Sequence, residues 1–321
     1  MPIINAPTFP SHRRPSRSLL SPPISTAKFT LTTDNKEKCF SIVIVNFNYG
    51  RFLQEAITSV LDQSCQDFEL IIVDGGSSDN SKEIISRNSD KLAWWCSEPD
   101  RGQSHAFNKG FSRAKGRFLT WLNADDIMFP GALERTKETI LANPDDEWFA
   151  AGCFWLDTDM RIMKCSSASP FSQRRVQRGL FSVCGPSSFF SRSLYLRSGG
   201  IDEDLHYMMD TELWGKFATV LGAKYTAVPG YCWGMRLHPD AKMSGHNFES
   251  SPMSSESHHS WNQKEEEAKT IASRYGQDRA TLFDRLITTS PIRKIKNFAD
   301  SHRYKGKHYR QFPGFNENRQ K

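Results

Sequence analysis

Short apolar runs alternate with segments of helical periodicity over the first half of the chain. Four runs of apolar or β-branched residues predict buried strands at 40–46, 68–74, 92–97 and 117–123. The segments between them place apolar residues on one helical face, which predicts helices at 50–64, 103–114 and 130–142. Ser78 or Asp79 is a candidate cap for a further helix. This order predicts an α/β fold with a mostly parallel central sheet and helices on both faces.

The pattern changes after residue 147. A hairpin is expected over 148–164 with its turn near 157–160, followed by strands at 183–190 and 224–228 and a helix within 205–221. The composition becomes polar after about residue 247, where helices at 262–275 and 279–286 remain plausible. We therefore expect three parts: a disordered basic arm over 1–37, an α/β domain over 38–248, and a polar, helical extension with a basic tail over 249–321.

Composition narrows the class of protein. Only 38% of the 321 residues are apolar, and no run of about 18 apolar residues occurs that would predict a membrane-spanning helix. The seven cysteines are scattered and never spaced as CxxC, which argues against a disulfide framework or a structural zinc site and favours a reducing compartment. Residues 1–33 carry four basic and no acidic residues; besides a disordered arm, an organelle transit peptide fits this composition.

The last part of the chain is strongly basic. From residue 291 onwards, Arg and Lys outnumber Asp and Glu nine to two. The plain interpretation is a solvated tail; the functional one is docking on an anionic lipid surface, where each basic residue contributes about 1 kcal/mol. Aromatic residues between the charges would also suit nucleic acid, but no nucleic-acid-binding module accompanies them, so none is expected. We expect a cytoplasmic protein, with peripheral contact at the inner face of the membrane as an option.

Two acidic clusters carry the chemistry, each at the end of an apolar run. LIIVDGGSSD contains Asp74 and Asp79, and FLTWLNADD contains Asp125 and Asp126. In open α/β sheets the carboxyl ends of the strands form the ligand crevice. Carboxylates at two such ends suit a nucleotide on one side and a hydrated divalent cation on the other. The alternative is a pair of turns in which Asp is merely a favoured turn residue.

The order of motifs from residue 41 to about 244 resembles the family 2 glycosyltransferases, inverting enzymes with the GT-A fold. The matching segments are SIVIVNFNYGRFLQEAITSVLDQS, FELIIVDGGSSDNS, SEPDRGQSHAFNKGFSRAKGRFLTWLNADD, GGIDEDLHYMMDTELWGKF and RLHPDAKMS. The resemblance implies transfer of a sugar from a nucleotide-diphosphate sugar to a hydroxyl acceptor. It also implies a role in the synthesis of a cell-surface glycan, polysaccharide or glycolipid, with a lipid-linked or glycan acceptor.

The resemblance also implies roles for residues on the donor side. Asp74 would accept a hydrogen bond from the base, usually uracil, and Asn46 would lie near the base or ribose. LNADD corresponds to the family's metal-binding DxD region, so Asp125 and Asp126 would hold Mg²⁺ or Mn²⁺ against the diphosphate. The family often has Asp where this chain has Asn123, whose amide oxygen can still position the ribose.

Further residues are implied around the sugar and the leaving group. Asp100 and Arg101 in the PDRGQ loop are candidates for donor contacts, with a surface ion pair as the alternative. Arg236 would offer a bidentate fork to phosphate. His238 would ligate the metal or donate to a phosphate oxygen, although a single His is often structural.

On the acceptor side, Asp210 in MMDTELW aligns with the family's catalytic base, and Glu212 is the second choice. A positioned base of this kind should have a raised pKa. The family often has Gln-Pro where this chain has Gly185-Pro186, so the acceptor cannot be carried over. Tryptophans 121, 155, 214 and 233 suit either a sugar platform or core packing.

Two other functions are open on the sequence. A catalytically silent nucleotide-sugar-binding scaffold would use the same fold without the chemistry. A nucleotidyltransferase of related fold would need a Gly- and Lys-rich loop after the first strand, where VNFNYGRF offers only Gly50 and Arg51.

Overall fold

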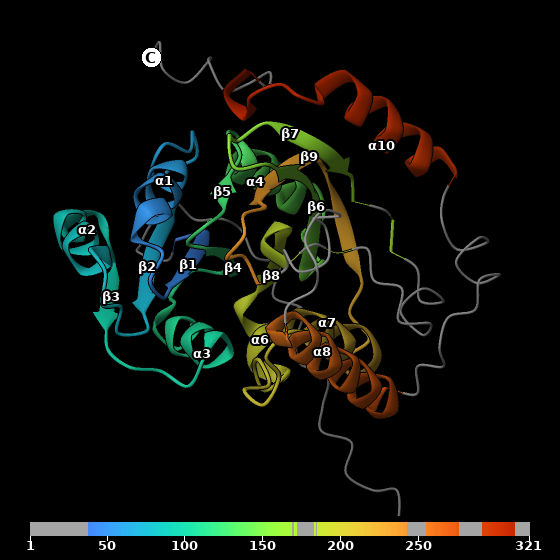
Figure 1. Ribbon diagram of the computed structural model, residues 1–321. Helices are drawn as coiled ribbons and strands as arrows, with labels where there is room; N and C mark the ends of the chain where they lie inside the picture. Colours follow the sequence, from blue (N-terminus) through green and yellow to red (C-terminus); the bar gives the residue numbers. More distant parts are fainter. Residues whose placement is uncertain are drawn as a thin grey trace, which may run out of the picture. The chain divides into compact units, whose positions relative to one another are not determined.

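The central sheet begins with four parallel strands (Figure 1). Their continuous apolar runs place them between two helical layers. In this computed structural model, the strands are β1 (Phe40–Asn46), β2 (Phe68–Asp74), β3 (Trp94–Ser97) and β4 (Phe118–Asn123). The helical segments between them are α1 (Gly50–Leu61), α2 (Ser81–Arg87), η1 (Ser89–Lys91) and α3 (Gln103–Arg113). The parallel pairing in the order β3-β2-β1-β4 confirms the parallel sheet predicted for the first half.

The structure describes residues 38–168, 170–171, 183, 185–242, 255–275 and 291–311, without the side chains of 255–261 and 291–293. These residues fall within one compact unit that starts at Glu37. The predicted N-terminal arm and the predicted helix at 279–286 lie outside the described residues. Among the described helices, none combines the length and the apolar character that crossing a bilayer requires.

The second half of the sheet is mixed rather than parallel. Its strands are β5 (Ile127–Met128), β6 (Trp148–Leu156), β7 (Ile162–Ser166), β8 (Ser188–Ser191) and β9 (Tyr225–Arg236). They continue the order as β8-β6-β9-β5, with β7 paired to β6 as a hairpin. The other elements are α4 (Ala132–Ala142), η2 (Gly185–Ser187), α6 (Arg192–Arg197), α7 (Met209–Gly215) and the π-helical segment η3 (Lys216–Val220). Antiparallel pairing arises where β7 and β8 return beside β6, and at β4–β8 and β5–β9.

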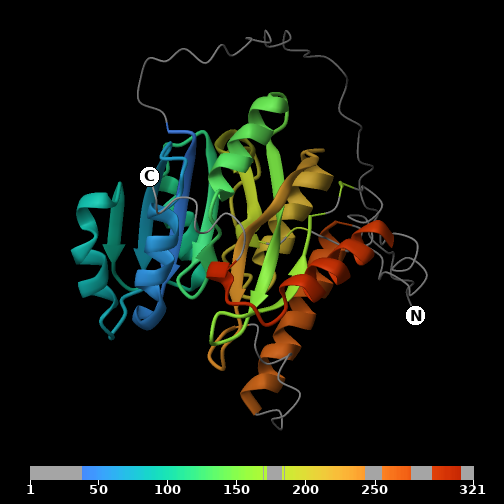
Figure 2. The ribbon, with the colours of Figure 1, turned by 90° about the horizontal axis from the view of Figure 1, so that it is seen from above.

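Helices pack on both faces of the sheet (Figures 1 and 2). Side chains of β1 alternate between the faces, so Ile42 and Ile44 meet α1, α2 and α4 in one cluster. Val43 and Val45 face the opposite cluster, with α3, α6 and α7. The layered α/β architecture predicted from the sequence is therefore confirmed.

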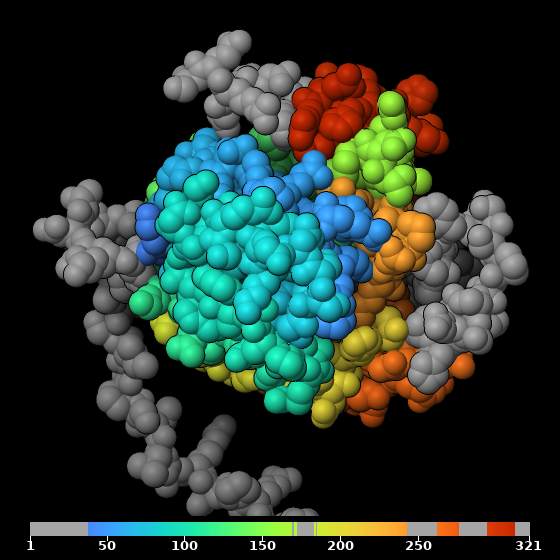
Figure 3. Space-filling view, turned by 60° about the vertical axis from the view of Figure 1, so that its left-hand side comes forward, coloured from blue at the N-terminus to red at the C-terminus, as the bar shows by residue number. Residues whose placement is uncertain are grey.

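The C-terminal extension packs on the same unit. It contains α8 (Ser255–Arg274), α10 (Pro291–Tyr304) and the short η5 (Tyr309–Gln311). Ile271 of α8 is buried in the cluster with α7, and α10 lies along β7, where Ser301 Oγ accepts from Cys165 N–H at 3.0 Å (Figure 3). Tyr309 is buried in a third cluster with β6 and β9 side chains. Described residues on the two sides of the boundary expected at residue 248 therefore pack against each other.

Candidate active site

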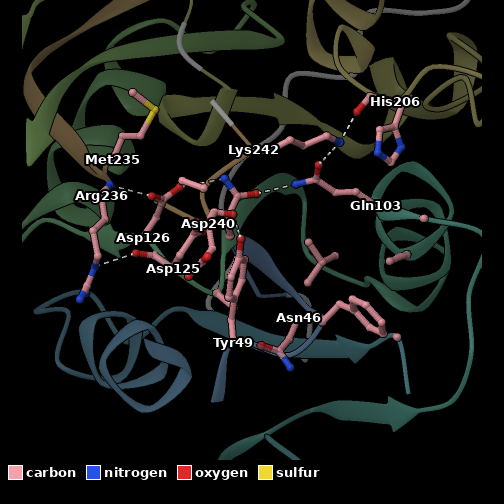
Figure 4. A pocket seen from close by; sticks show the side chains of 18 of the residues that line it. Asn46, Tyr49, Gln103, Asp125, Asp126, His206, Met235, Arg236, Asp240 and Lys242 are labelled. Carbon is pink, nitrogen blue, oxygen red and sulfur yellow. Dashed lines mark hydrogen bonds between the residues drawn. The ribbon is translucent and has the colours of Figure 1, made fainter. Parts of the chain in front are cut away.

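A cavity of about 600 Å³ opens at the carboxyl ends of β1 and β4 (Figure 4). The chain leaves β1 for β2 and β3 and then returns to β4 on the other side of β1, and such a switch point is where α/β sheets bind ligands. The lining is completed by the end of β9 and the loop after it. The lining residues include Asn46, Phe47, Tyr49, Gly75, Asp100, Gly102, Gln103, Asn123, Asp125, Asp126, His206, Met235, Arg236, Asp240 and Lys242.

Asp126 is a buried carboxylate at the wall of this cavity, with 2% of its surface exposed. Its Oδ1 accepts from the Arg236 backbone N–H at 3.0 Å, and its Oδ2 accepts from Asn123 Nδ2 at 2.8 Å. Burial, and then the charge of Asp125, raise the pKa of Asp126 well above its usual value. A cation beside the two carboxylates would relieve that cost, so the pair fits a hard divalent ion.

Asp125 pairs with His238, whose Nε2 lies 3.1 Å from Asp125 Oδ2. The His238 ring packs against Tyr49 and Phe52. In the described part of the chain, no three His, Cys, Asp or Glu side chains stand together as a complete metal-binding group. A cation held by one or two of these carboxylates would therefore need oxygen ligands from phosphate and water, as Mg²⁺ commonly has.

Arg236 has partners other than those the sequence suggested. Its side chain is buried; Nε donates to the Asp125 carbonyl at 2.9 Å and Nη2 donates to Glu55 at 2.6 Å. Its backbone N–H also donates to Asp126, so Arg236 fixes the position of the loop that carries Asp125 and Asp126. In this structure Arg236 thus supports the carboxylate pair at the cavity wall.

Asp74 does not line the cavity. It is fully buried, and its two oxygens accept from Asn46 Nδ2 at 2.6 Å, Ser97 Oγ at 2.7 Å, and Ser77 through both Oγ (2.5 Å) and the backbone N–H (3.0 Å). A carboxylate has about four lone-pair sites, so these donors occupy them all. In this structure Asp74 ties the end of β2 to β1 and β3.

Another carboxylate occupies the neighbouring position. A Cβ placed on Gly75 would lie 2.7 Å from Asp100 Oδ2 and 3.2 Å from the Phe47 ring, so the missing side chain leaves room for both. Asp100 Oδ1 accepts from Gly102 N–H at 2.8 Å, which orients the carboxylate. Arg101, by contrast, pairs with Glu203 and is not among the lining residues.

Two amide side chains connect the parts of the site. Asn123 accepts from Gln103 Nε2 at 2.9 Å while it donates to Asp126, so an Asp at position 123 would set a like charge against Asp126. Asn46 lines the cavity and donates to Asp74. Both amide side chains thus also stabilise the ends of the strands on which they lie.

Asp210 lies in an adjoining cavity of about 230 Å³. The two cavities share Gln103, Asn123, Met235 and Lys242 in their linings. Burial raises the pKa of Asp210, and its Oδ1 accepts from Thr211 N–H at 2.6 Å. Four aromatic residues also line this cavity: Trp121, Trp155, Tyr207 and Trp233.

Glu212, the second choice for the base, has a structural position. It is buried, accepts from Tyr275 Oη at 2.6 Å and pairs with Lys216 at 3.0 Å. It is absent from the linings of both cavities.

Sequence reasoning assigned no role to several lining residues. Lys242 donates to Gln103 Oε1 at 3.1 Å and to the His206 carbonyl, and burial lowers the pKa of its ammonium to about 8. Tyr49 donates to the Asp240 carbonyl at 2.7 Å, which ties α1 to the loop after β9. Gln103 and Tyr49 belong to the motifs quoted above, but their roles were not apparent from the sequence. The structure shows that Gln103 lines both cavities and that Tyr49 joins two walls of the larger one.

The geometry agrees with comparisons to known proteins. Residues 41–196 match the model of glycosyl transferase family 2. Structures of TarS from S. aureus share the fold: the complete protein gives a TM-score of 0.52 at 15% identity, covering 83% of this chain and 49% of TarS. Residues 1–349 of TarS in complex with UDP-GlcNAc give 0.50 at 16%, covering 63% of this chain and 59% of theirs. The chain therefore carries a glycosyl transferase family 2 domain with the GT-A fold.

Curated relatives carry the same description. An uncharacterized glycosyltransferase of Rickettsia typhi is 29% identical over 188 residues, which cover 56% of this chain and 58% of the relative. One from Mycobacterium tuberculosis is 31% identical over 175 residues, covering 54% and 66%. One from Nostoc is 41% identical over 101 residues, covering 30% and 31%. The alignments thus span between 31% and 66% of the length of these relatives.

Proposed function

We propose that the chain is an inverting glycosyltransferase that moves a sugar from a nucleotide-diphosphate sugar to a hydroxyl of a glycan or glycolipid acceptor. The observation that carries the proposal is that two cavities, each lined by at least one carboxylate, adjoin and share four lining residues. The larger cavity has the volume of a cofactor-sized site, and the smaller one holds Asp210.

The donor base occupies the slot above Gly75, between Phe47 and Asp100. Phe47 is an exposed aromatic side chain that offers a stacking face. The Asp100 carboxylate is a hydrogen-bond acceptor only, so it suits a base with a ring N–H, such as uracil, thymine or guanine. Because TarS has been solved with UDP-GlcNAc on this fold, a UDP-sugar is the first donor to test.

Asp210 acts as the base in a single displacement. Its carboxylate takes the proton from the acceptor hydroxyl while the hydroxyl oxygen attacks the anomeric carbon and the bond to the diphosphate breaks. Attack from the face opposite the leaving group inverts the configuration. The raised pKa of Asp210 supports this role, because a base with a pKa closer to the working pH transfers protons more effectively.

Asp125 and Asp126 would hold a divalent cation, with His238 hydrogen-bonded to Asp125. When bound, Mg²⁺ or Mn²⁺ neutralises charge on the departing diphosphate. Asn123 and Arg236 fix the orientation of Asp126 through their hydrogen bonds.

The acceptor binds in the aromatic cavity around Asp210. The half-buried indole ring of Trp155 offers a flat apolar face to a sugar ring, and Gly185 keeps the wall clear of Asp210. A Cβ on Gly185 would lie 3.3 Å from Asp210 Oδ2. The class of acceptor that fits is a carbohydrate hydroxyl.

The outer face of α10 contacts an anionic membrane in a peripheral manner. Ile295 and Phe298 are 69% and 75% exposed there, with the exposed Lys294 and Lys296 beside them. Apolar side chains flanked by basic ones are typical of helices that lie in the lipid interface. Ile295→Ser with Phe298→Ser should reduce binding to phosphatidylserine-containing vesicles without changing the melting temperature; unchanged binding would count against the contact.

A donor and acceptor panel tests the proposed reaction. Wild type, Asp126→Ala and the exposed control Asp90→Ala are incubated with UDP-, GDP- and dTDP-sugars, Mn²⁺ or Mg²⁺, and sugar acceptors. We expect nucleoside diphosphate release and transfer in wild type and Asp90→Ala, lost in Asp126→Ala. Stabilisation of wild type by a nucleoside diphosphate without release or transfer would instead favour the silent scaffold.

A further inference from the structure

The loop before Asp210 is held by a carboxylate from the C-terminal extension. Glu267 of α8 accepts three consecutive backbone N–H groups, from His206 at 2.9 Å and from Tyr207 and Met208 at 2.8 Å each. Glu267 itself is 6% exposed. One buried side chain thus satisfies the whole run of amides that leads into α7.

These amides belong to the three residues just before α7, and the last of them, Met208, is the N-cap of the helix. The N-cap residue, Met208, makes no side-chain capping bond. Glu267 instead accepts from the amides of the N-cap residue and the two residues before it, which fixes the chain where it enters α7. On the carbonyl side of the same loop, Lys242 donates to His206. The loop is therefore fixed from two directions.

Helix α8 is anchored to the domain along one face. Glu267, Ile271 and Tyr275 are spaced four residues apart, so they project from the same side. Ile271 is buried among the side chains of α7, and Tyr275 bonds to Glu212 at 2.6 Å. All three lie beyond residue 196, where the family match ends.

We propose that Glu267 is a positioning residue for the transfer reaction, which holds Asp210 at the acceptor cavity by binding the amides of residues 206–208. The inference rests on the proposed function, because it assigns Glu267 to the base of that reaction. Glu267 acts through the loop and touches neither substrate. Its removal should therefore misplace the base while the donor cavity keeps its walls.

The kinetic test compares Glu267→Gln with Glu266→Gln. Glu266 is the neighbouring exposed residue on α8 and pairs only with Lys269 and the helix itself in the described contacts. We expect Glu267→Gln to lower kcat about 10- to 100-fold with the donor KM within about twofold of wild type, because a small displacement of a catalytic group is costly. Glu266→Gln should match wild type. Equal kcat in Glu267→Gln and wild type would overturn the proposal.

Tyr275→Phe distinguishes the contact of Glu267 with the loop amides from the general packing of α8 on the domain. It removes the bond to Glu212 but leaves the loop amides alone, so kcat should stay within about twofold of wild type. A loss as large as that of Glu267→Gln would contradict a specific role for Glu267. Glu267→Asp, which keeps the charge on a shorter side chain, should fall between Gln and wild type and also serves if Glu267→Gln does not fold.

Hydrogen exchange tests the contact without any substrate. Amides 206–208 should exchange at least tenfold faster in Glu267→Gln than in wild type or Glu266→Gln. If faster exchange is found but wild type transfers no sugar to any acceptor, the proposed function fails while the contact stands. If wild type is active and exchange is unchanged in Glu267→Gln, the contact fails alone.

Discussion

The carboxylate of Glu55 on α1 receives the guanidinium of Arg236 at the end of β9, at 2.6 Å, although 181 residues separate them. Arg236 in turn binds the Asp125 carbonyl and the Asp126 carboxylate. Glu55 also accepts from Tyr309 Oη at 2.8 Å, so Tyr309 is linked to the acidic loop through two residues, Glu55 and Arg236.

The first prediction concerns this pair. Glu55→Gln should lower the free energy of unfolding by about 1.5–3 kcal/mol, the range for a hydrogen bond to a charged group, because Arg236 stays buried without its counter-charge. Urea unfolding provides the measurement, with Glu138→Gln on the exposed face of α4 as the matched control. Equal stability of the two variants would mean that the pair is dispensable.

The second prediction concerns nucleotide choice. Asp100→Ala should weaken UDP binding about tenfold, which corresponds to about 1.4 kcal/mol, and leave CDP binding unchanged. The reason is that the ring nitrogen of uracil carries a proton for a carboxylate and that of cytosine does not. Calorimetric titration with both nucleotides measures the preference. Equal losses for UDP and CDP would place Asp100 away from the base edge.

The third prediction concerns the pH dependence of donor binding. Lys242 lines both cavities with a pKa of about 8, so its charge is present below that pH and is lost above it. UDP affinity should therefore fall as pH rises through 8, because the positive charge of Lys242 is lost there. Lys242→Gln should show weaker binding with a flat profile. A wild-type affinity that rises over this interval would refute the assignment.

The fourth prediction concerns acid stability. Arg197, with Ser193 and Ser191, lowers the pKa of Glu147 to about 2 from the usual 4.5. A lowered folded-state pKa stabilises the protein above pH 4.5, and this contribution is lost as pH falls towards 2. The stability gap between wild type and Glu147→Gln should therefore be larger at pH 7 than at pH 3. Urea melts at both values measure it, and a gap that widens in acid would contradict the sign.

Sequence patterns were sufficient for the first half of the fold. FSIVIVN and FELIIVD are mostly apolar runs that end in a polar residue, and β1 and β2 have the predicted bounds. The second half was harder because β9 contains Pro229 and Gly230, and its pairing with β6 shifts register. The helix α10 was missed because the face it turns to β7 carries polar residues such as Asn297 and Ser301.

The candidate site was predicted in part, because the sequence shows where strands end but not which side chains meet across the fold. Residues at strand ends could be placed near the crevice, so Asn46, Asn123, Asp125 and Asp126 line it. Hydrogen-bond partners distant in sequence could not be foreseen. Donors from the ends of β1 and β3 and from Ser77 occupy the Asp74 carboxylate, and Glu55 pairs with Arg236.

The central claim is that Asp210 removes the acceptor proton beside a separately bound donor. Donor affinity and transfer rate should be measured together in wild type and Asp210→Asn. The account predicts a donor Kd within about twofold and a transfer rate lower by about 10² to 10⁴, the contribution of a positioned base. Transfer by Asp210→Asn at the wild-type rate would contradict it.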